Sequence, residues 1–282
     1  MNAKQKMPVR ILVIASLIVL MLFVLFPYYW LIICSVKPKS EIFSAIPGFF
    51  PKNITLEGYQ YAFSSSPGPD LLNLLSNSLV VSIITAVVSC IFAATGGYAI
   101  GRKHFPGISA IIVFLMLAQM FQGPVIMVPW YKMAASMHVL NTKLGLILIY
   151  LTSTIPIGVW LMSGFFKDIP RELEEAAQID GCGQFRTFLQ IVMPLSKGGL
   201  VSITIYSFIL AWNDYQYALI LTNSAQAKTV QLGISELIGG LGVINWGGIL
   251  ACGVVVTLPV VILFSVVQKY LVEGMTAGAV KG

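Results

Sequence analysis

EEAAQIDG at residues 174–181, followed by MPL at residues 193–195, belongs to the longest charged, water-compatible stretch of an otherwise strongly apolar chain. The pattern predicts a short helix, a tight turn and a second short helix. We expect Asp168 to cap the first helix and Pro170 to lie in its first turn, where a missing N–H costs nothing. Gly181 and Gly183 can adopt positive φ and end that helix.

The second helix is predicted from apolar spacing at Phe185, Phe188, Leu189 and Val192. This spacing runs to Pro194, which cannot continue a regular helix. From periodicity alone, residues 167–197 form a solvated amphipathic hairpin between two buried helices.

Composition argues against a soluble protein. Of the 282 residues, 57% are hydrophobic and only 10% are charged, and the mean hydropathy is +0.86. Globular proteins are nearer to about 25% charged. The net charge of +6 comes without a basic cluster among exposed aromatic residues, so it does not indicate nucleic-acid binding. Four cysteines without Cys-x-x-Cys spacing and two distant histidines do not indicate a metal site.

Six apolar runs are long enough to cross the roughly 30 Å hydrocarbon core of a bilayer as helices. The predicted spans are about 11–36, 78–101, 107–130, 144–166, 198–221 and 248–268. The first is too long for a signal-peptide core, so we expect it to be retained. The sequence therefore predicts an all-α membrane protein with six transmembrane helices and one transmembrane domain over residues 1–282. Between the first two spans, residues 37–77 are polar and contain five prolines, with a short helix expected around 56–63.

The orientation follows from lysine and arginine in the loops. With the N-terminus inside, eleven of these residues fall in inner segments and six in outer segments. This bias follows the positive-inside rule. It predicts that both termini and the hairpin at 167–197 are cytoplasmic.

Polar residues of several spans fall at a similar depth, just outside the midplane. Such residues usually face the bundle interior or a wet cavity, where breaks at Gly123-Pro124 and at Pro156 would be tolerated. The candidate substrate-pathway residues are Gln119, Gln122, Asn213, Asp214, Tyr206 and Tyr215. Further groups at this depth are Thr85, Thr152, Ser153, Thr154 and Trp212.

The same residues also have structural interpretations. Serine and threonine often bond to their own helix, and glutamine or asparagine can join two helices. Asp214, the one charged residue within the predicted spans, can cap a helix break. The sequence leaves both interpretations open.

The spacing Glu-Ala-Ala, two residues, Asp-Gly, then Ile191 and Pro194-Leu195 resembles the cytoplasmic loop of ABC importer permeases. Flanking segments look like the sugar-uptake, maltose-type branch: LNT at 140–142, WND at 212–214 and TAGAVKG at 276–282. The resemblance extends from the first span to the last residue. It implies the type I ABC importer permease fold, with a coupling helix hairpin that docks into a groove on the ATP-hydrolysing subunit. The ATPase-coupling residues it implies are Glu175, Ala176, Ala177, Asp180, Gly181 and Pro194.

The resemblance also implies an assembly in the bacterial cytoplasmic membrane: a second, homologous permease, two ABC ATPase subunits and an extracytoplasmic solute-binding protein. The sequence has no phosphate loop, so ATP and magnesium are expected on the partner ATPase, with no cofactor on this chain and no enzymatic activity of its own. In this family the partner permease often supplies most substrate contacts. The loop 222–247 can reach into the binding protein in maltose-type importers; alternatively, it lies on the outer interface with Trp246 as an anchor.

The sequence supports other functions less strongly. Within the same machinery, the substrate can be another small solute such as glycerol phosphate. A self-contained secondary transporter normally has paired intramembrane charges, whereas Asp214 stands alone. An intramembrane enzyme is disfavoured because the sequence has no His-Glu-x-x-His, no Gly-x-Ser-x-Gly and no pair of membrane aspartates. The sequence does not name the sugar.

Overall fold

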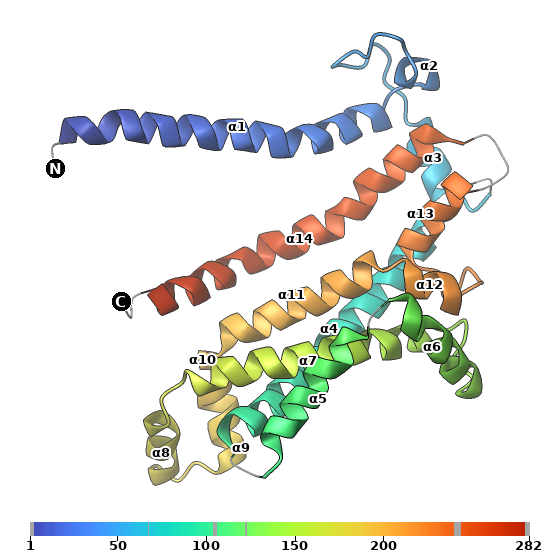
Figure 1. The fold of residues 1–282 in the computed structure, drawn as a ribbon. Helices are drawn as coiled ribbons and strands as arrows, with labels where there is room; N and C mark the ends of the chain where they lie inside the picture. Colours follow the sequence, from blue (N-terminus) through green and yellow to red (C-terminus); the bar gives the residue numbers. More distant parts are fainter. Residues whose placement is uncertain (1–2, 67, 104–105, 122, 240–243, 280–282) are drawn as a thin grey trace. The chain divides into compact units, whose positions relative to one another are not determined.

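The computed structural model describes residues 3–66, 68–103, 106–121, 123–239 and 244–279, and its regular structure in these ranges is entirely helical (Figure 1). The helices are α1 (Ala3–Ser35), α2 (Lys39–Ile42), α3 (Glu57–Phe63), α4 (Leu71–Arg102), α5 (Ile108–Met120), α6 (Pro124–Ser136), α7 (Lys143–Lys167), α8 (Glu172–Ile179), α9 (Gln184–Thr187), the π-helical turn η1 (Phe188–Val192), α10 (Met193–Leu195), α11 (Lys197–Asn213), α12 (Gln216–Leu221), α13 (Val230–Gly239) and α14 (Trp246–Ala279).

Four helices are long and apolar enough to cross a membrane by themselves: Val9–Ser35, α4, α7 and Trp246–Lys269. Two bent helix pairs raise the number of spans to as many as six, namely Ile108–Met120 with Val125–Ser136, and Gln184–Leu195 with α11. The predicted all-α membrane architecture is therefore confirmed, and six spans is the upper end of what these helices allow. The short helix expected around 56–63 is α3.

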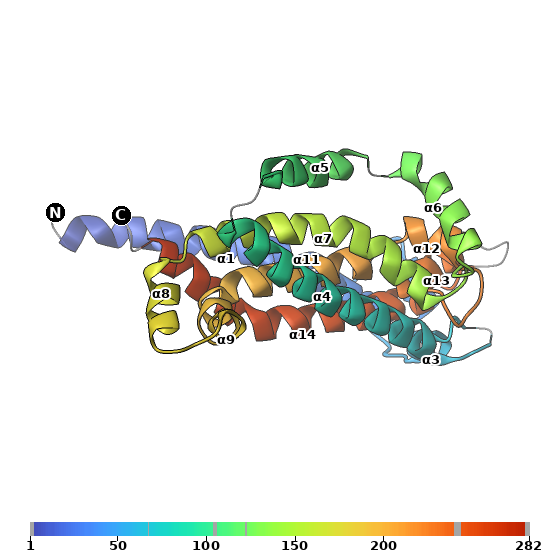
Figure 2. The same cartoon turned by 90° about the horizontal axis from the view of Figure 1, so that it is seen from below.

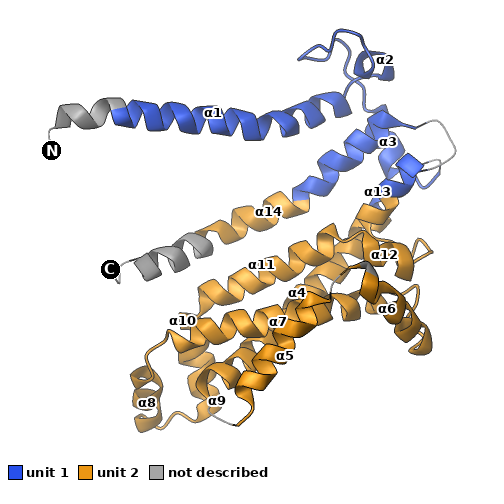
Figure 3. Cartoon of the chain, in the orientation of Figure 1, with its two compact units in different colours: residues 1–72, 234–258 blue, residues 73–233, 259–282 orange. Residues whose placement is uncertain are grey.

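The chain divides into two compact units (Figure 3). Unit 1 contains residues 1–72 and 234–258, and unit 2 contains residues 73–233 and 259–282. The prediction of one transmembrane domain over the whole chain stays a prediction.

Unit 1 is built around the end of α1 and the segment that follows it. The Lys37 ammonium lies 5.0 Å from the centroid of the Trp30 ring and donates to the carbonyl of Gly48. Thr55 N–H donates to the Val36 carbonyl at 2.9 Å, and the Ser35 and Tyr59 hydroxyls lie 2.8 Å apart. These contacts fold residues 37–59 back onto the end of α1. The apolar side chains of α1 itself are largely exposed within this chain.

Unit 2 is held together by close packing of α4, α7 and α11, which run side by side in Figures 1 and 2. Gly97 of α4 packs so tightly on Met162 of α7 that an added Cβ would overlap the Met162 Cβ. Gly158 of α7 leaves similarly little room between Ala93 of α4 and Ile203 of α11. Small residues at these positions allow the backbones to approach, as at helix contacts in membranes. The three helices therefore form a closely packed centre of unit 2.

Two helix breaks differ from the sequence prediction. The expected interruption at Pro156 is absent, because α7 runs unbroken from Lys143 to Lys167. The fifth predicted span, 198–221, is instead divided at Asp214, whose backbone is extended between α11 and α12. A further helix, α13, forms within the connection 222–247 that was predicted only as a loop.

Candidate functional site

The hairpin that carries the sequence motif consists of α8, a turn at residues 180–183, and the helical segment Gln184–Leu195 (Figure 1). Helix α8 ends at Ile179, and Gly181 has φ of +84°. The N–H groups of Gly181 and Cys182 donate to the carbonyls of Gln178 and Ala177 at 3.0 and 2.9 Å. This pairing satisfies carbonyls left open by the helix end, as in a glycine C-cap. The prediction of positive φ at Gly181 is confirmed.

Two expectations about this hairpin are wrong. Gly183 has φ of −67° and ψ of 158°, which is extended backbone that any residue adopts. Asp168 does not cap α8: it ends α7, and the N-terminal flanking residue of α8 is Arg171, without a side-chain cap. Helix α8 therefore starts at Glu172, later than the position of Pro170 suggested.

The second arm of the hairpin is helical across Pro194. The wide turn η1 lies directly before Met193 and Pro194, and the arm meets α11 at an angle of 78° around Ser196. In a π-type turn, backbone N–H groups bond to the carbonyl five residues earlier instead of four. Pro194 has no N–H to contribute to either pattern. Phe188 and Val192 of this turn are buried in one core with residues of α4, α7 and α11. The hairpin is thus rooted in unit 2.

The tip of the hairpin exposes apolar side chains. Ile179 is 86% exposed and Phe185 is 73% exposed, and these two residues flank the Gly181 turn. Of the predicted coupling residues, Glu175, Ala176, Asp180, Gly181 and Pro194 are exposed. Ala177 is buried, at 5% exposed, so its small side chain serves packing within this chain. Exposed apolar side chains that lie together on a water-compatible segment make the tip a candidate docking surface.

A polar contact that the sequence analysis missed ties α8 to the last turn of α4. Glu174 forms an ion pair with Arg102, with Nε and Oε1 2.7 Å apart, and it accepts a hydrogen bond from the Tyr98 hydroxyl at 2.8 Å. The two charged side chains are 6% and 12% exposed. The sequence analysis used Arg102 only in the charge count that gives the orientation. It used Glu174 only as one of three acidic residues near the start of a helix. Residues about 70 positions apart carry no local signal of such a pair.

Asp214 has a clear structural role in unit 2. One carboxylate oxygen accepts from the Tyr150 hydroxyl at 2.7 Å and from the Ala218 N–H at 3.0 Å, and the other accepts from the Tyr217 N–H at 3.4 Å. Asp214 therefore caps the start of α12 across the helix break, as an aspartate N-cap does. The structure favours the capping interpretation, and Tyr150 is a partner that the sequence analysis did not identify.

Gln119 also has a structural explanation. Its side-chain amide donates to the Thr152 carbonyl at 3.3 Å. In α7 this carbonyl lies four residues before Pro156, so it is the acceptor that loses its partner because proline has no N–H. The Gln119 amide replaces that donor from α5. This contact explains how α7 continues through Pro156.

The other polar-layer residues separate into exposed and buried groups. Asn213, Tyr206 and Tyr215 are exposed in this chain, whereas Gln122 lies outside the described residues. Fully or almost fully buried are Thr85, Thr154 and Trp212. Trp212 stacks on Phe208, with ring centroids 5.6 Å apart, so it offers no face to a sugar.

Asn141 holds the connection that follows α12 in place. It adopts φ of +57°, and its side-chain oxygen accepts from the backbone N–H groups of Asn223 and Ser224 at 3.0 and 2.9 Å. Its own N–H donates to the Leu221 carbonyl at 2.7 Å. Through Asn141, the LNT segment thus binds the chain that follows α12 by hydrogen bonds.

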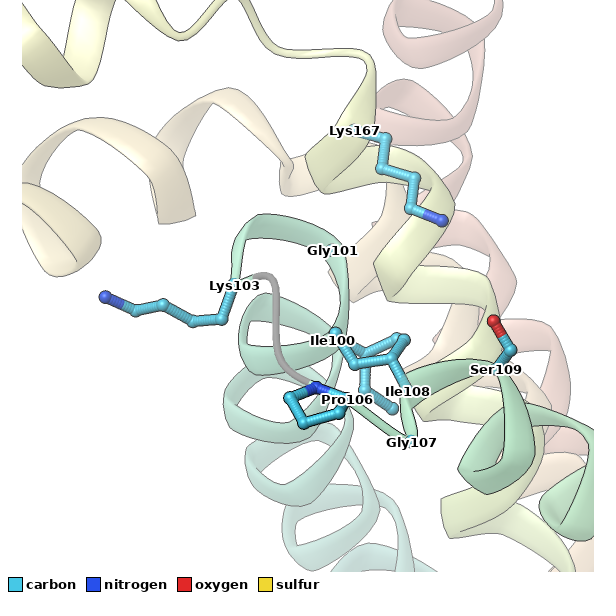
Figure 4. A pocket seen from close by; sticks show the side chains of 8 residues that line it. All are labelled: Ile100, Gly101, Lys103, Pro106, Gly107, Ile108, Ser109 and Lys167. Atoms are coloured by element: carbon cyan, nitrogen blue, oxygen red, sulfur yellow. The ribbon is translucent and has the colours of Figure 1, made fainter.

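A cavity of about 510 Å³ lies between the adjoining ends of α4, α5 and α7 (Figure 4). It is lined by Ile100, Gly101, Lys103, Pro106, Gly107, Ile108, Ser109 and Lys167. In Figure 4 the Lys103 side chain extends away from the other lining residues, so the polar groups do not converge on a ligand. None of the candidate substrate-pathway residues lines it. Within the described ranges, no group of three metal-ligating side chains could hold a metal ion.

Comparisons with known proteins agree with this architecture. Inner membrane ABC transporter permease protein YcjP of Escherichia coli (strain K12) is 34% identical over 95% of both chains. The diacetylchitobiose uptake system permease protein DasC of Streptomyces coelicolor is 34% identical over 94% of this chain and 95% of the relative. The trehalose/maltose transport system permease protein MalG of Thermococcus litoralis is 33% identical over 97% of both chains.

The fold is also found among solved structures. A chain from the crystal structure of a bacterial ABC transporter involved in the import of the acidic polysaccharide alginate matches with a TM-score of 0.80 at 22% identity. The match covers 96% of this chain and 99% of that chain, which shows the importer permease fold. Residues 6–277 match the model of one family, described as binding-protein-dependent transport system inner membrane component. The chain belongs to this family of inner-membrane permeases.

Proposed function

We propose that this chain is one permease subunit of an ATP-driven, binding-protein-dependent importer that moves a sugar or oligosaccharide across the cytoplasmic membrane. The relatives named for diacetylchitobiose and for trehalose and maltose, each similar along nearly the whole chain, support a saccharide as the substrate. A different small solute, such as glycerol phosphate, is the alternative within the same machinery.

The observation that carries the coupling role is the exposed apolar pair Ile179 and Phe185 on a hairpin rooted in the core of unit 2. Such side chains are unfavourable in water, and each releases about 1.5–3 kcal/mol when a partner covers it. The adjoining carboxylates of Glu175 and Asp180 are exposed and can pair with basic groups of that partner. A cytoplasmic ABC ATPase subunit with an apolar groove fits this surface.

Three kinds of partner, four subunits in all, belong to the proposed assembly. Two ATPase subunits bind and hydrolyse ATP with magnesium, since this sequence has no phosphate loop. A second permease covers the apolar faces that this chain leaves exposed, including those of α1. A solute-binding protein outside the membrane delivers the substrate.

The mechanism is alternating access. When ATP closes the ATPase dimer, the hairpins of the two permeases move with it, and the spans turn from an inward-open to an outward-open arrangement. Among the candidates that the structure describes, Asn213 and Tyr215 are exposed at the α11–α12 break and Tyr206 is exposed earlier on α11, so these side chains are available to line the pathway. Asp214 shapes that break by capping α12.

The proposal is tested by placing a charge on the docking surface. Ile179→Asp is expected to leave the chain in the membrane and to abolish binding-protein-stimulated ATPase activity in reconstituted vesicles, because a carboxylate cannot enter an apolar groove. Gln178→Asp adds the same charge at a neighbouring position that is already exposed and polar, and it is expected to retain the stimulation. Wild-type stimulation in Ile179→Asp would mean that this hairpin does not dock on an ATPase.

The substrate is tested separately. The cognate solute-binding protein is titrated with maltose, trehalose, diacetylchitobiose and glycerol 3-phosphate, and heat release is measured. We expect binding of a saccharide, and binding of glycerol 3-phosphate alone would replace the sugar with the alternative solute.

A further inference from the structure

We propose that Glu174 is a positioning residue that fixes α8 to the last turn of α4 through Arg102 and Tyr98, and that this link carries hairpin movement into the membrane spans. The inference deepens, and therefore rests on, the coupling role proposed above for the hairpin.

Both oxygens of the Glu174 carboxylate are held by α4. Oε1 pairs with the Arg102 Nε at 2.7 Å, and Oε2 accepts from the Tyr98 hydroxyl at 2.8 Å. Charge-assisted contacts of this kind are shorter and stronger than neutral hydrogen bonds. Because the ion pair is largely buried, it is also less screened by salt than a surface pair.

The two α4 residues reach further elements. Arg102 Nη2 donates to the Ile169 carbonyl at 2.7 Å, so one guanidinium holds both α8 and the segment between α7 and α8. The Tyr98 ring packs on Phe166 of α7 and Phe188 of η1, with centroids 5.8 and 4.7 Å apart. Any displacement of α8 therefore acts on the end of α4 and on its packing against α7.

The two adjacent glutamates of the motif have different roles. Successive residues of an α-helix point about 100° apart, since there are 3.6 residues per turn. Glu174 points into the chain and is satisfied by it, whereas Glu175 is exposed and available to a partner. Of the two adjacent glutamates, Glu174 thus fixes α8 to α4 within the chain, and Glu175 is free to contact a partner subunit.

Replacing both Arg102 and Glu174 by neutral residues distinguishes a role in positioning α8 from a role in stabilising the fold. Removing one member of a buried ion pair leaves an uncompensated charge and is strongly destabilising, whereas replacing both by apolar residues is often neutral. Arg102→Met with Glu174→Met is therefore expected to insert and to assemble like the unaltered chain. If Glu174 matters only for stability, this double variant will also function normally.

The readout is movement of α4 in the complete complex with its ATPase. A cysteine is introduced at Ala99, an exposed position in the last turn of α4, where water can reach the thiol. Its maleimide labelling, above the level of the parent chain, is measured with and without ATP and vanadate. We expect a nucleotide-dependent change in labelling in the otherwise unaltered chain and loss of most of that change in the Met/Met variant. The reversed pair, Arg102→Glu with Glu174→Arg, is expected to recover more than half of it. Glu172→Gln, an exposed glutamate in the same first turn, is the matched control and is expected to keep the full change.

A full response in the Met/Met variant would overturn the inference, and so would a reversed pair that recovers nothing. Absence of any nucleotide-dependent change in the unaltered chain would instead overturn the coupling role itself. The two failures are therefore distinguishable.

Discussion

At the scale of single residues, the same chemical type serves different purposes according to its contacts. Asp214 was a candidate for substrate contact because it is a charge at membrane depth, but its oxygens are occupied by Tyr150 and by two backbone N–H groups. Its neighbour Asn213 is exposed. A charge inside a span therefore marks a special position without saying whether that position is functional or structural.

The capping role of Asp214 predicts a loss of stability. Asp214→Leu leaves the Tyr150 hydroxyl and the α12 N–H groups without their acceptor, which costs about 1–3 kcal/mol for a buried donor. We expect a lower Tm of the detergent-purified complex, and a smaller decrease in Tyr150→Phe, which removes only the hydroxyl. Asn213→Leu is expected to leave Tm unchanged and to reduce transport. An unchanged Tm in Asp214→Leu would contradict the capping role.

The turn of the hairpin predicts different responses at its two glycines. A side chain at Gly181, where φ is +84°, costs about 1–2 kcal/mol because left-handed backbone is unfavourable for L-residues. Gly181→Val is therefore expected to leave the chain inserted but to lose stimulated ATPase activity and uptake. Gly183→Val is the control, because Gly183 is extended and a Cβ there meets nothing within 4 Å. Equal activity of both variants would mean that the turn geometry is not required.

At the scale of helices, hydropathy predicted where the long helices lie better than where they break. The predicted spans 78–101 and 144–166 lie within α4 and α7, because uncharged runs of this length have few alternatives to a helix in a bilayer. Breaks depend on whether another residue satisfies the freed backbone group. Pro156 is tolerated because Gln119 supplies a donor, and the α11–α12 break persists because Asp214 caps the new helix start.

The relation between Gln119 and Pro156 gives a double-mutant prediction. Gln119→Leu leaves the Thr152 carbonyl without its side-chain donor. Because this contact is exposed in the chain, we expect the loss of an ordinary hydrogen bond, about 0.5–1.5 kcal/mol. In a Pro156→Ala background the backbone N–H of residue 156 can donate to this carbonyl, so Gln119→Leu is expected to cost much less. Thermal unfolding of the four proteins measures the coupling. Additive effects would show that Gln119 does not substitute for the missing N–H.

The candidate site could be predicted only in part, because sequence spacing reports local structure and not contacts between distant residues. Local spacing identified the hairpin and the positive φ of Gly181, because helix ends and turns leave their signal within a few residues. The Arg102–Glu174 pair and the Tyr150–Asp214 pair join residues more than 60 positions apart, and a single sequence carries no record of such contacts. The burial of Ala177 also depends on which face of α8 meets the core.

At the scale of the whole molecule, the exposed surface is that of one part of a larger assembly. The apolar side chains of α1 and the tip of the hairpin are exposed in this chain, and they differ in their surroundings. Those of α1 belong to an uncharged span that suits lipid or another membrane subunit, whereas Ile179 and Phe185 lie among charged residues that suit an aqueous partner. The orientation of the chain decides on which side of the membrane that partner must be.

The lysine and arginine distribution predicts that the hairpin is cytoplasmic and that residues 37–77 are outside. Asp180→Cys and Ile46→Cys place single reporters at exposed positions of the two regions. In sealed cells, a membrane-impermeant maleimide is expected to label Ile46→Cys and to leave Asp180→Cys at the level of the parent chain, which measures any reaction of the native cysteines. The cells produce this chain without the ATPase, which would otherwise cover residue 180. Permeabilising them is expected to make Asp180→Cys reactive, which shows that the site was protected by the membrane. Labelling of Asp180→Cys in sealed cells would reverse the orientation, and a cytoplasmic ATPase could then not reach the hairpin.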